Sequence, residues 1–140
     1  MAESDLDFEQ WQHTVPESIR AEKFWSMIAY QKALYLYDLL WQDTLTWLPD
    51  VRGQELARQV IASADSVCSN IEEGYGRGFG RQLLQFYGYA LGSARETKGH
   101  IYRGKGLIPE VVVRKRLDLA SEVVALLLTE LNRQKYRSHC

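Results

Sequence analysis

The sequence predicts an all-α protein, an antiparallel up-down-up-down four-helix bundle with an acidic N-terminal arm. Apolar residues recur at three- and four-residue spacing in four long stretches, whereas no stretch alternates apolar and polar residues as a strand would. Breaks rich in glycine or proline separate these stretches. The chain of 140 residues is 46% hydrophobic, which is enough for one packed core in one ordinary domain.

The N-terminal arm is expected over residues 1–20, and we expect it to be loosely ordered because it shows little periodicity. Thr14 and Glu17 have the spacing of a capping box, which predicts a short helical lead-in there. The bundle itself is expected over residues 21–135, and residues 136–140 are expected to fray.

The first long helix is predicted over residues 24–48 and is apolar on more than one side. Its core face is formed by Met27, Tyr30, Leu34, Tyr37, Trp41, Leu45 and Leu48. A second apolar set lies beside that face and consists of Ile28, Tyr35, Leu39 and Leu40. Because a four-helix core covers only one stripe of each helix, we expect this second set to contact another copy of the protein.

The second helix is predicted over residues 53–73, where Gly74 and Gly76 are expected to end it. The third helix is predicted over residues 81–103 and the fourth over residues 109–135. Glycines at 88, 92 and 99 are unusual inside a helix, since each costs about 1 kcal/mol relative to alanine. We expect that a closely approaching backbone or a bulky aromatic side chain compensates for this cost.

Charge is unevenly distributed along the chain. Residues 1–50 hold nine acidic and three basic side chains, whereas residues 51–140 hold nine acidic and fourteen basic ones. The net charge of −1 argues against binding of nucleic acid by bulk charge alone. Two interpretations remain open for the densest basic stretch, residues 95–116: solvated helix ends, or a surface that meets a polyanion or an acidic neighbour. The candidate nucleic-acid contacts are Arg77, Arg81, Arg95, Lys98, Arg103, Lys105, Arg114, Lys115 and Arg116.

The glycine-rich segment 74–81 separates the second and third predicted helices. It lacks the preceding strand and the following Gly-Lys-Ser/Thr that a phosphate-binding loop requires. One interpretation is a helix cap and a turn. The other is a nucleic-acid contact, in which Arg77 and Arg81 bind phosphates and Tyr75 or Phe79 stacks on bases.

A cluster of polar residues follows one face of the second and third helices and comprises Ser66, Asn70, Glu73, Ser93 and Glu96. It predicts a buried hydrogen-bond network that fixes the helix register, with a ligand or catalytic site as the alternative. No histidine or cysteine is placed to act there as a base or nucleophile. We therefore expect no catalytic residue, no cofactor and no small-molecule substrate.

The remaining composition points to a cytoplasmic protein. Only two cysteines occur, Cys68 and Cys140, which indicates a reducing compartment. The three histidines are dispersed, so no metal site is expected. The N-terminus has no apolar run typical of a signal peptide, and no uncharged stretch is long enough to cross a membrane.

The junction of the second and third helices carries a motif. Ser66 is followed by Asn-Ile-Glu-Glu-Gly-Tyr-Gly-Arg over residues 70–77, and then by Phe86, Ala90, Gly92, Ser93 and Glu96. This pattern resembles the four helix bundle protein family, first noticed as proteins encoded by intervening sequences in large-subunit ribosomal RNA genes. The resemblance covers about residues 24–133. It differs at Ile61 and Ala62, where many members carry an arginine pair, and at Cys68, where proline is frequent.

The resemblance implies a bundle that assembles with copies of itself as a ring, commonly a pentamer. A related branch is the accessory protein of diversity-generating retroelements, a pentameric barrel that binds nucleic acid and a reverse transcriptase. The family has no established catalytic activity. The resemblance thus implies RNA, single-stranded DNA and a reverse transcriptase as partners.

Three functional hypotheses follow. The first is a non-enzymatic oligomeric scaffold that binds nucleic acid or a nucleoprotein. The second is a ring that only mediates protein–protein contacts, with the basic half of one subunit against the acidic arm of its neighbour or an acidic partner. The third is an enzyme whose site is the polar cluster of Ser66, Asn70, Glu73, Ser93 and Glu96.

Overall fold

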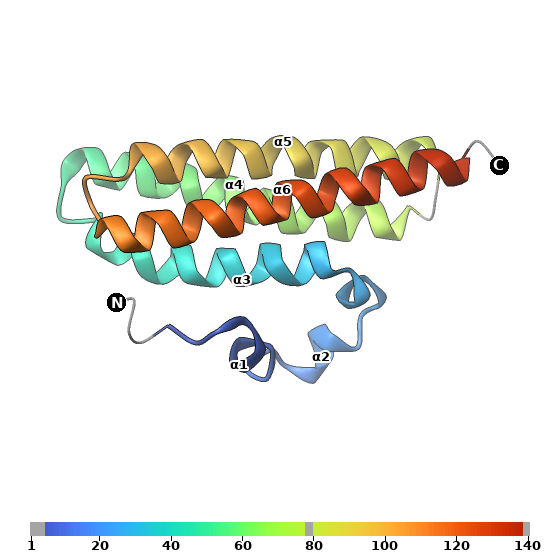
Figure 1. Cartoon of the computed structure of the whole chain (residues 1–140), viewed down its shortest axis with the longest axis horizontal. Coiled ribbons are helices and arrows are strands. Elements are labelled where there is room, and N and C mark those ends of the chain that lie inside the picture. Colours follow the sequence, from blue (N-terminus) through green and yellow to red (C-terminus); the bar gives the residue numbers. More distant parts are fainter. Residues whose placement is uncertain (1–4, 78–79, 139–140) are drawn as a thin grey trace.

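The computed structural model describes residues 5–77 and 80–138 and confirms the predicted fold class. Four long helices, α3 (Ile28–Asp43), α4 (Val51–Gly76), α5 (Arg81–Arg103) and α6 (Glu110–Ser138), pack antiparallel in chain order (Figure 1). Helix α5 lies between α4 and α6, and α3 packs against both α4 and α6. No strand occurs within the described part of the chain.

The first long helix is shorter than predicted. Residues 24–48 divide into a 3-10 turn η2 (Lys23–Ser26), helix α3 and a second 3-10 turn η3 (Thr44–Thr46). Helix α3 ends where the Thr44 hydroxyl donates to the carbonyl oxygen of Leu40, at 2.9 Å. A side chain that binds the preceding turn in this way competes with continuation of the helix.

Helix α4 is longer than predicted at both ends. It begins at Val51 because the Asp50 carboxylate accepts hydrogen bonds from the backbone amides of Arg52 and Gly53. It continues through Gly74, which was expected to break it. A Cβ atom at Gly74 would lie 2.8 Å from the Tyr87 ring, so this glycine serves the close packing of α4 on α5.

The N-terminal arm packs on the bundle through its described residues, 5–20. It forms two short helices, α1 (Phe8–Gln12) and α2 (Glu17–Arg20), which lie along the outside of the bundle (Figure 1). The predicted capping box at Thr14 does not form, because its hydroxyl donates to the Trp11 carbonyl oxygen. A capping box is present instead between Asp7 and Gln10.

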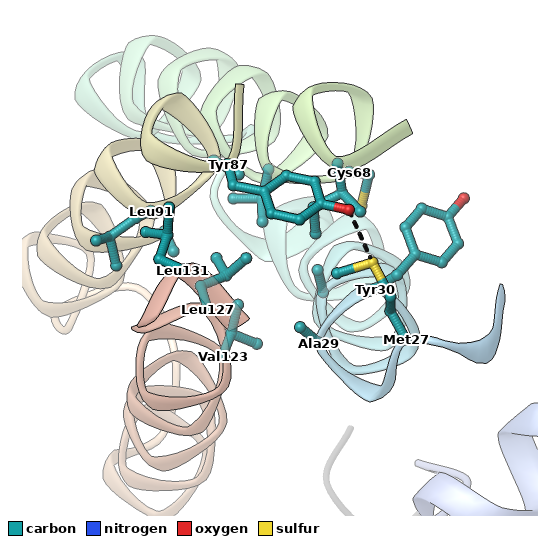
Figure 2. Close-up of a cluster of buried hydrophobic side chains, with 14 of the residues drawn as sticks. Met27, Ala29, Tyr30, Cys68, Tyr87, Leu91, Val123, Leu127 and Leu131 are labelled. Carbon is teal, nitrogen blue, oxygen red and sulfur yellow. Dashed lines mark hydrogen bonds between the residues drawn. The ribbon is translucent and has the colours of Figure 1, made fainter. Parts of the chain in front are cut away.

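The core is formed by two clusters of buried side chains. Figure 2 shows the first, in which Tyr87 from α5 points toward Met27 and donates to its sulfur at 3.2 Å. The second cluster surrounds Trp47, which is fully buried. A Cβ atom on Gly104 would lie 2.5 Å from the Trp47 ring. The chain therefore needs glycine at this position for the indole to fit.

Candidate functional site

The outer face of α5 presents a basic strip with little side-chain bulk. Gly88, Gly92, Arg95, Gly99 and Tyr102 follow one another at three- and four-residue spacing, so they share one side of the helix. All of them except Gly99 are exposed. The helix carries four arginine and lysine side chains, Arg81, Arg95, Lys98 and Arg103, and a single acidic one, Glu96. This face therefore has a positive charge although the whole chain is close to neutral.

The basic side chains of this strip are available to a ligand. Among the described residues, Arg81, Arg95 and Lys98 form no ion pair. The Lys105 ammonium group lies 4.2 Å from the centre of the exposed Tyr102 ring, which places an aromatic face beside a cation. An aromatic ring next to unpaired cations is suited to stacking on a base while the cations bind phosphates.

Gly88 and Gly92 do not have the partner that we expected within the chain, whereas the Arg103 side chain lies over Gly99. A Cβ atom at Gly88 or Gly92 would meet no atom within 4 Å. The prediction of a close contact is therefore wrong inside one copy. The strip is an open, smooth surface that a bulky partner can approach closely.

The other predicted contact residues lie in different settings. Arg77 pairs with Glu73 at 3.3 Å and Arg114 pairs with Glu110 at 3.0 Å, both on the exposed surface. Exposed pairs of this kind are weak and leave the arginine free to exchange partners. Lys115 is exposed on α6. Phe79, proposed to stack on bases, lies outside the described residues.

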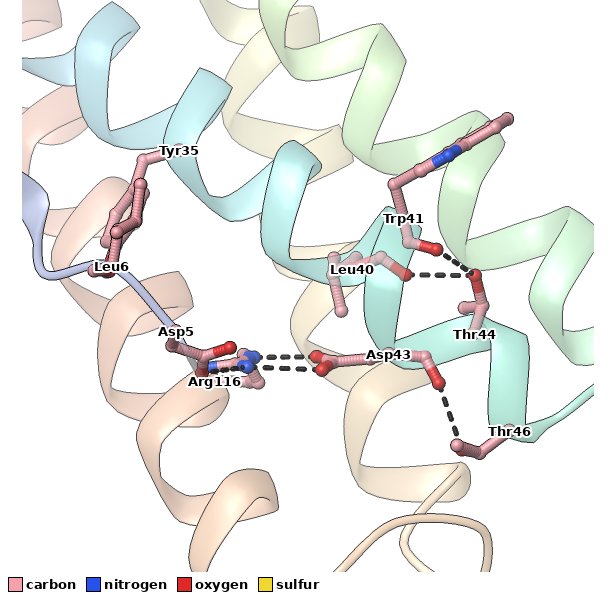
Figure 3. A network of polar contacts seen from close by, with 9 residues as sticks. All are labelled: Asp5, Leu6, Tyr35, Leu40, Trp41, Asp43, Thr44, Thr46 and Arg116. Atoms are coloured by element: carbon pink, nitrogen blue, oxygen red, sulfur yellow. Dashed lines mark hydrogen bonds and ion pairs between the residues drawn. The ribbon is translucent and has the colours of Figure 1, made fainter. Parts of the chain in front are cut away.

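Arg116 is the exception, and its assignment as a nucleic-acid contact is wrong. Its side chain is only 3% exposed and lies between Asp5 of the arm and Asp43 of α3 (Figure 3). Its Nε atom donates to Asp43 at 2.6 Å, and an Nη atom donates to Asp5 at 2.7 Å. Burial by itself would lower the pKa of Arg116, but the hydrogen bonds to both carboxylates outweigh it and raise the pKa. The guanidinium group joins the arm to the bundle.

The arm packs over Tyr35, one of the four residues that we expected to contact another copy. Tyr35 donates from its hydroxyl to the Leu6 carbonyl oxygen at 2.6 Å, and its ring packs against those of Phe8 and Trp11. Leu39 and Leu40 are buried in the subunit itself. Leu39 and Leu40 are therefore not available to another copy. Tyr35 is half-buried and Ile28 is exposed, and an interface that includes these two stays a prediction.

Exposed apolar side chains are nevertheless present within residues 24–48, the first predicted long helix. Trp41 is 55% exposed and Leu45 is 57% exposed, although both were assigned to the core. They line a groove of about 920 Å³ between α3 and α4, together with Leu48 and Ile61. Two charged side chains of α4, Arg58 and Asp65, also line it. The expected excess of apolar surface thus lies in this α3–α4 groove.

The predicted polar cluster is brought together only in part. Ser93 donates to the Ser66 hydroxyl at 2.9 Å, and the Asn70 amide donates to the same hydroxyl at 2.9 Å. Glu73 is exposed and bonded to Arg77, and Glu96 is exposed on α5. The three joined residues link α4 to α5.

A second polar contact, fully buried, was missed. The hydroxyls of Ser63 and Thr97 lie 2.8 Å apart between α4 and α5. Ser63 stands at helical spacing from Ser66 and Asn70, which is the signal that could have indicated it. Thr97 stands at helical spacing with the apolar residues Ala90, Ala94 and Ile101, so its hydroxyl gives no separate signal in the sequence.

Replacement of Thr97 by valine is expected to lower the free energy of unfolding by about 1 kcal/mol. The hydrogen bond between the two buried hydroxyls is lost, and the Ser63 hydroxyl keeps only the Val60 carbonyl oxygen as a partner. Urea denaturation measures the effect. The double variant Ser63→Ala, Thr97→Val should lose less than the sum of the single changes. Purely additive losses would show that the two hydroxyls do not interact.

Two further features of the described residues, 5–77 and 80–138, bear on function. None of their helices has the length and apolar character needed to cross a bilayer. They also hold no group of three or more histidine, cysteine, aspartate or glutamate residues that could hold a metal ion.

Comparison with known proteins places the chain in a family. Neither the search of curated proteins nor the search of solved structures found a match. The family model described as 23S rRNA-intervening sequence protein matches residues 26–129, which leaves the arm outside the match. The matched segment contains the four long helices up to Thr129 and the whole basic strip of α5. The chain belongs to the 23S rRNA-intervening sequence protein family.

Proposed function

We propose that this protein is a non-enzymatic, self-associating scaffold that binds nucleic acid, or a nucleoprotein, through the outer face of α5. The observation that carries the proposal is the outer face of α5, where three glycines and Tyr102 lie beside the unpaired Arg95 and Lys98. The family's description names an intervening sequence of 23S rRNA, so RNA is the first nucleic acid to test. Single-stranded DNA and a reverse transcriptase are further candidate partners.

The chemistry of the strip fits a sugar–phosphate backbone. Arg95 and Lys98 supply positively charged N–H groups that can donate hydrogen bonds to phosphate oxygens. The exposed Tyr89 and Tyr102 supply rings on which bases can stack. Gly88 and Gly92 have no side chains, so a nucleic-acid strand can approach this part of the helix closely without displacing any side chain.

Self-association would strengthen this modest surface. Several copies of the strip on one particle act together, and the avidity can exceed the affinity of a single strip by about two orders of magnitude or more. The exposed apolar side chains of the α3–α4 groove support such an assembly. The ring of five subunits that the resemblance implies stays a prediction.

The double substitution Arg95→Glu, Lys98→Glu is expected to weaken binding of single-stranded RNA by about 10- to 100-fold at low salt. It should also lower the slope of log affinity against log salt by about one for each cation that contacts a phosphate. Fluorescence anisotropy with a labelled RNA measures both quantities. The control is Arg52→Glu, which changes the same type of charge at the start of α4.

Equal losses in Arg52→Glu and the double variant would contradict a specific role for the α5 strip. The absence of any binding by the unaltered protein at low salt would contradict the nucleic-acid function as a whole. In that case the remaining hypothesis is the scaffold that only mediates protein–protein contacts. In that hypothesis the acidic arm contacts a neighbouring subunit. Asp5 cannot make that contact while it is paired with Arg116 of its own chain.

A further inference from the structure

A pocket lies at the turn between α5 and α6, at the end of the bundle where the basic strip of α5 stops (Figure 1). Its volume is about 480 Å³, within the range of about 300–1,000 Å³ that is usual for pockets holding small organic groups. It is lined by residues of α5, of the turn and of the N-terminal part of α6, namely Tyr102, Lys105, Glu110, Val113, Arg114 and Leu117. We propose that this pocket holds an unpaired guanine base of a single-stranded RNA, with the adjoining phosphate bound by Lys105.

The lining of the pocket suits the flat faces of a base and the charge of its phosphate. Tyr102 is 55% exposed, so its ring is open to stacking, while Val113 and Leu117 supply an apolar side. The Lys105 ammonium group lies 4.2 Å from the centre of the Tyr102 ring and forms no ion pair among the described residues. Because the lysine stem is flexible, the ammonium group can move from the ring to the phosphate, and the base then takes its place over the ring.

The pair of Glu110 and Arg114 is the feature that selects guanine. Arg114 donates from Nε and from an Nη atom to one carboxylate oxygen, Oε2, at 3.2 and 3.0 Å. The other oxygen, Oε1, accepts no hydrogen bond from the described residues. Guanine carries two neighbouring N–H donors, on N1 and N2, with the O6 acceptor beside them. The carboxylate can therefore accept from both donors while the arginine donates to O6.

The other three bases fit this pair less well. A carboxylate only accepts hydrogen bonds, so it repels any acceptor that it faces. Uracil has one N–H group between two carbonyl oxygens, and adenine and cytosine each have a ring nitrogen acceptor next to the amine. Each of these bases would turn an acceptor toward Glu110 when its donor is bonded there. Bases in single strands are commonly read by such contacts to their Watson–Crick edges.

The proposal rests on the nucleic-acid binding in the proposed function and names the base that the bound strand presents. Tyr102 belongs to both surfaces, whereas Glu110, Val113, Arg114 and Leu117 come from α6. The strip of α5 offers cations and exposed rings, which accept any base. A preference for one base therefore reports on the pocket, and the affinity for a strand of uridines reports on the strip.

Base substitution in the RNA tests the pocket. A labelled oligouridine in which one central uridine is replaced by guanosine should bind about fivefold more tightly than the unsubstituted strand. This is near the lower end for a bidentate base contact, because Glu110 and Arg114 are exposed. Adenosine and cytidine should give no such gain, and inosine, which lacks the N2 amine, should give a smaller one. Fluorescence anisotropy measures the affinities.

Two substitutions separate the contributions of the pocket. Glu110→Gln should remove the preference for guanosine, because an amide puts a donor in place of one carboxylate oxygen. Tyr102→Leu should weaken binding of the guanosine strand by about fivefold or more, because the stacking surface is lost. The control is Glu55→Gln, which changes an exposed glutamate that lies 3.8 Å from Arg58 on α4 and should keep the preference. A preference that survives in Glu110→Gln would overturn the assignment.

Guanosine monophosphate gives a readout that does not need RNA. In an NMR titration of isotope-labelled protein, it should shift the amide signals of residues 102–117 more than uridine monophosphate does. RNA binding without a preference for guanosine, together with equal shifts for the two nucleotides, would overturn the guanine pocket and leave the proposed function intact. Selective guanosine monophosphate binding without RNA binding would support the pocket and contradict the nucleic-acid function. The absence of both would overturn both.

Discussion

Replacing Arg116 with methionine is expected to lower the free energy of unfolding by about 3–5 kcal/mol. The guanidinium group is the partner of the Asp43 carboxylate, whose side chain is only 5% exposed. Loss of the arginine would leave that carboxylate buried without a compensating charge, which costs far more than the loss of an exposed ion pair. Urea denaturation of the variant and the unaltered protein gives the difference.

The double variant Arg116→Met, Asp43→Leu serves as the control. It removes the two most buried charges and leaves only Asp5, whose side chain is 19% exposed. The variant should therefore recover most of the loss, because an apolar pair of similar volume is commonly as stable as a buried ion pair. Asp5→Asn should cost only about 1 kcal/mol, because its side chain is more exposed than that of Asp43. A loss below about 1 kcal/mol in Arg116→Met would contradict this account of the buried ion pair between Arg116 and Asp43.

Replacing Gly53 with alanine is expected to cost about 3 kcal/mol, the upper part of the range for overpacking a well-packed site. The added Cβ atom would overlap the carbonyl oxygen of Trp47 and press against Leu107. A backbone atom cannot rotate away as a flexible side chain can, so the start of α4 or the turn before it must shift. Thermal unfolding of the variant, followed by circular dichroism, measures the loss.

Gly88→Ala is the matched control for Gly53→Ala. Position 88 is also helical but meets no atom within 4 Å, so alanine there should raise stability by about 0.5–1 kcal/mol. A similar destabilisation in both variants would show that the packing around Trp47 does not explain the need for glycine at position 53.

The fold class and the ends of α5 could be predicted from the sequence because local signals agree there. The helix was expected over residues 81–103 and is observed as Arg81–Arg103. Gly80 has a φ of +91°, which side-chain-bearing residues rarely adopt, and Gly104 follows the last turn. Glycines at both boundaries give clear start and stop signals, whereas Gly74 looks the same in sequence and lies inside α4.

The first long helix could not be assigned correctly from periodicity alone. It has two apolar sides of similar strength, and spacing does not say which of them faces the core. Leu40 is in the core and Trp41 is exposed, the reverse of the expectation. Tyr35 packs against Phe8 and Trp11 of the arm. Because the arm shows little periodicity, spacing alone could not predict this contact.

Arg116 was misassigned because it stands in a basic run beside Arg114 and Lys115. The spacing along α6 nevertheless indicates that Arg116 is buried. Val112, Arg116 and Ala120 are four residues apart from one to the next, and all three are buried. A charged residue on a core stripe indicates a buried ion pair rather than a surface contact. Its partners, Asp5 and Asp43, lie far away in sequence, and no local pattern identifies them.

The most direct test of the central claim, a self-associating scaffold that binds nucleic acid, is the mass of the purified protein by light scattering with and without RNase treatment. We predict a particle that is a multiple of the 16.2 kDa chain after RNase treatment, and a heavier one with absorbance at 260 nm before it. A sample that has the mass of a single chain under both conditions, with no bound nucleic acid, would contradict the account.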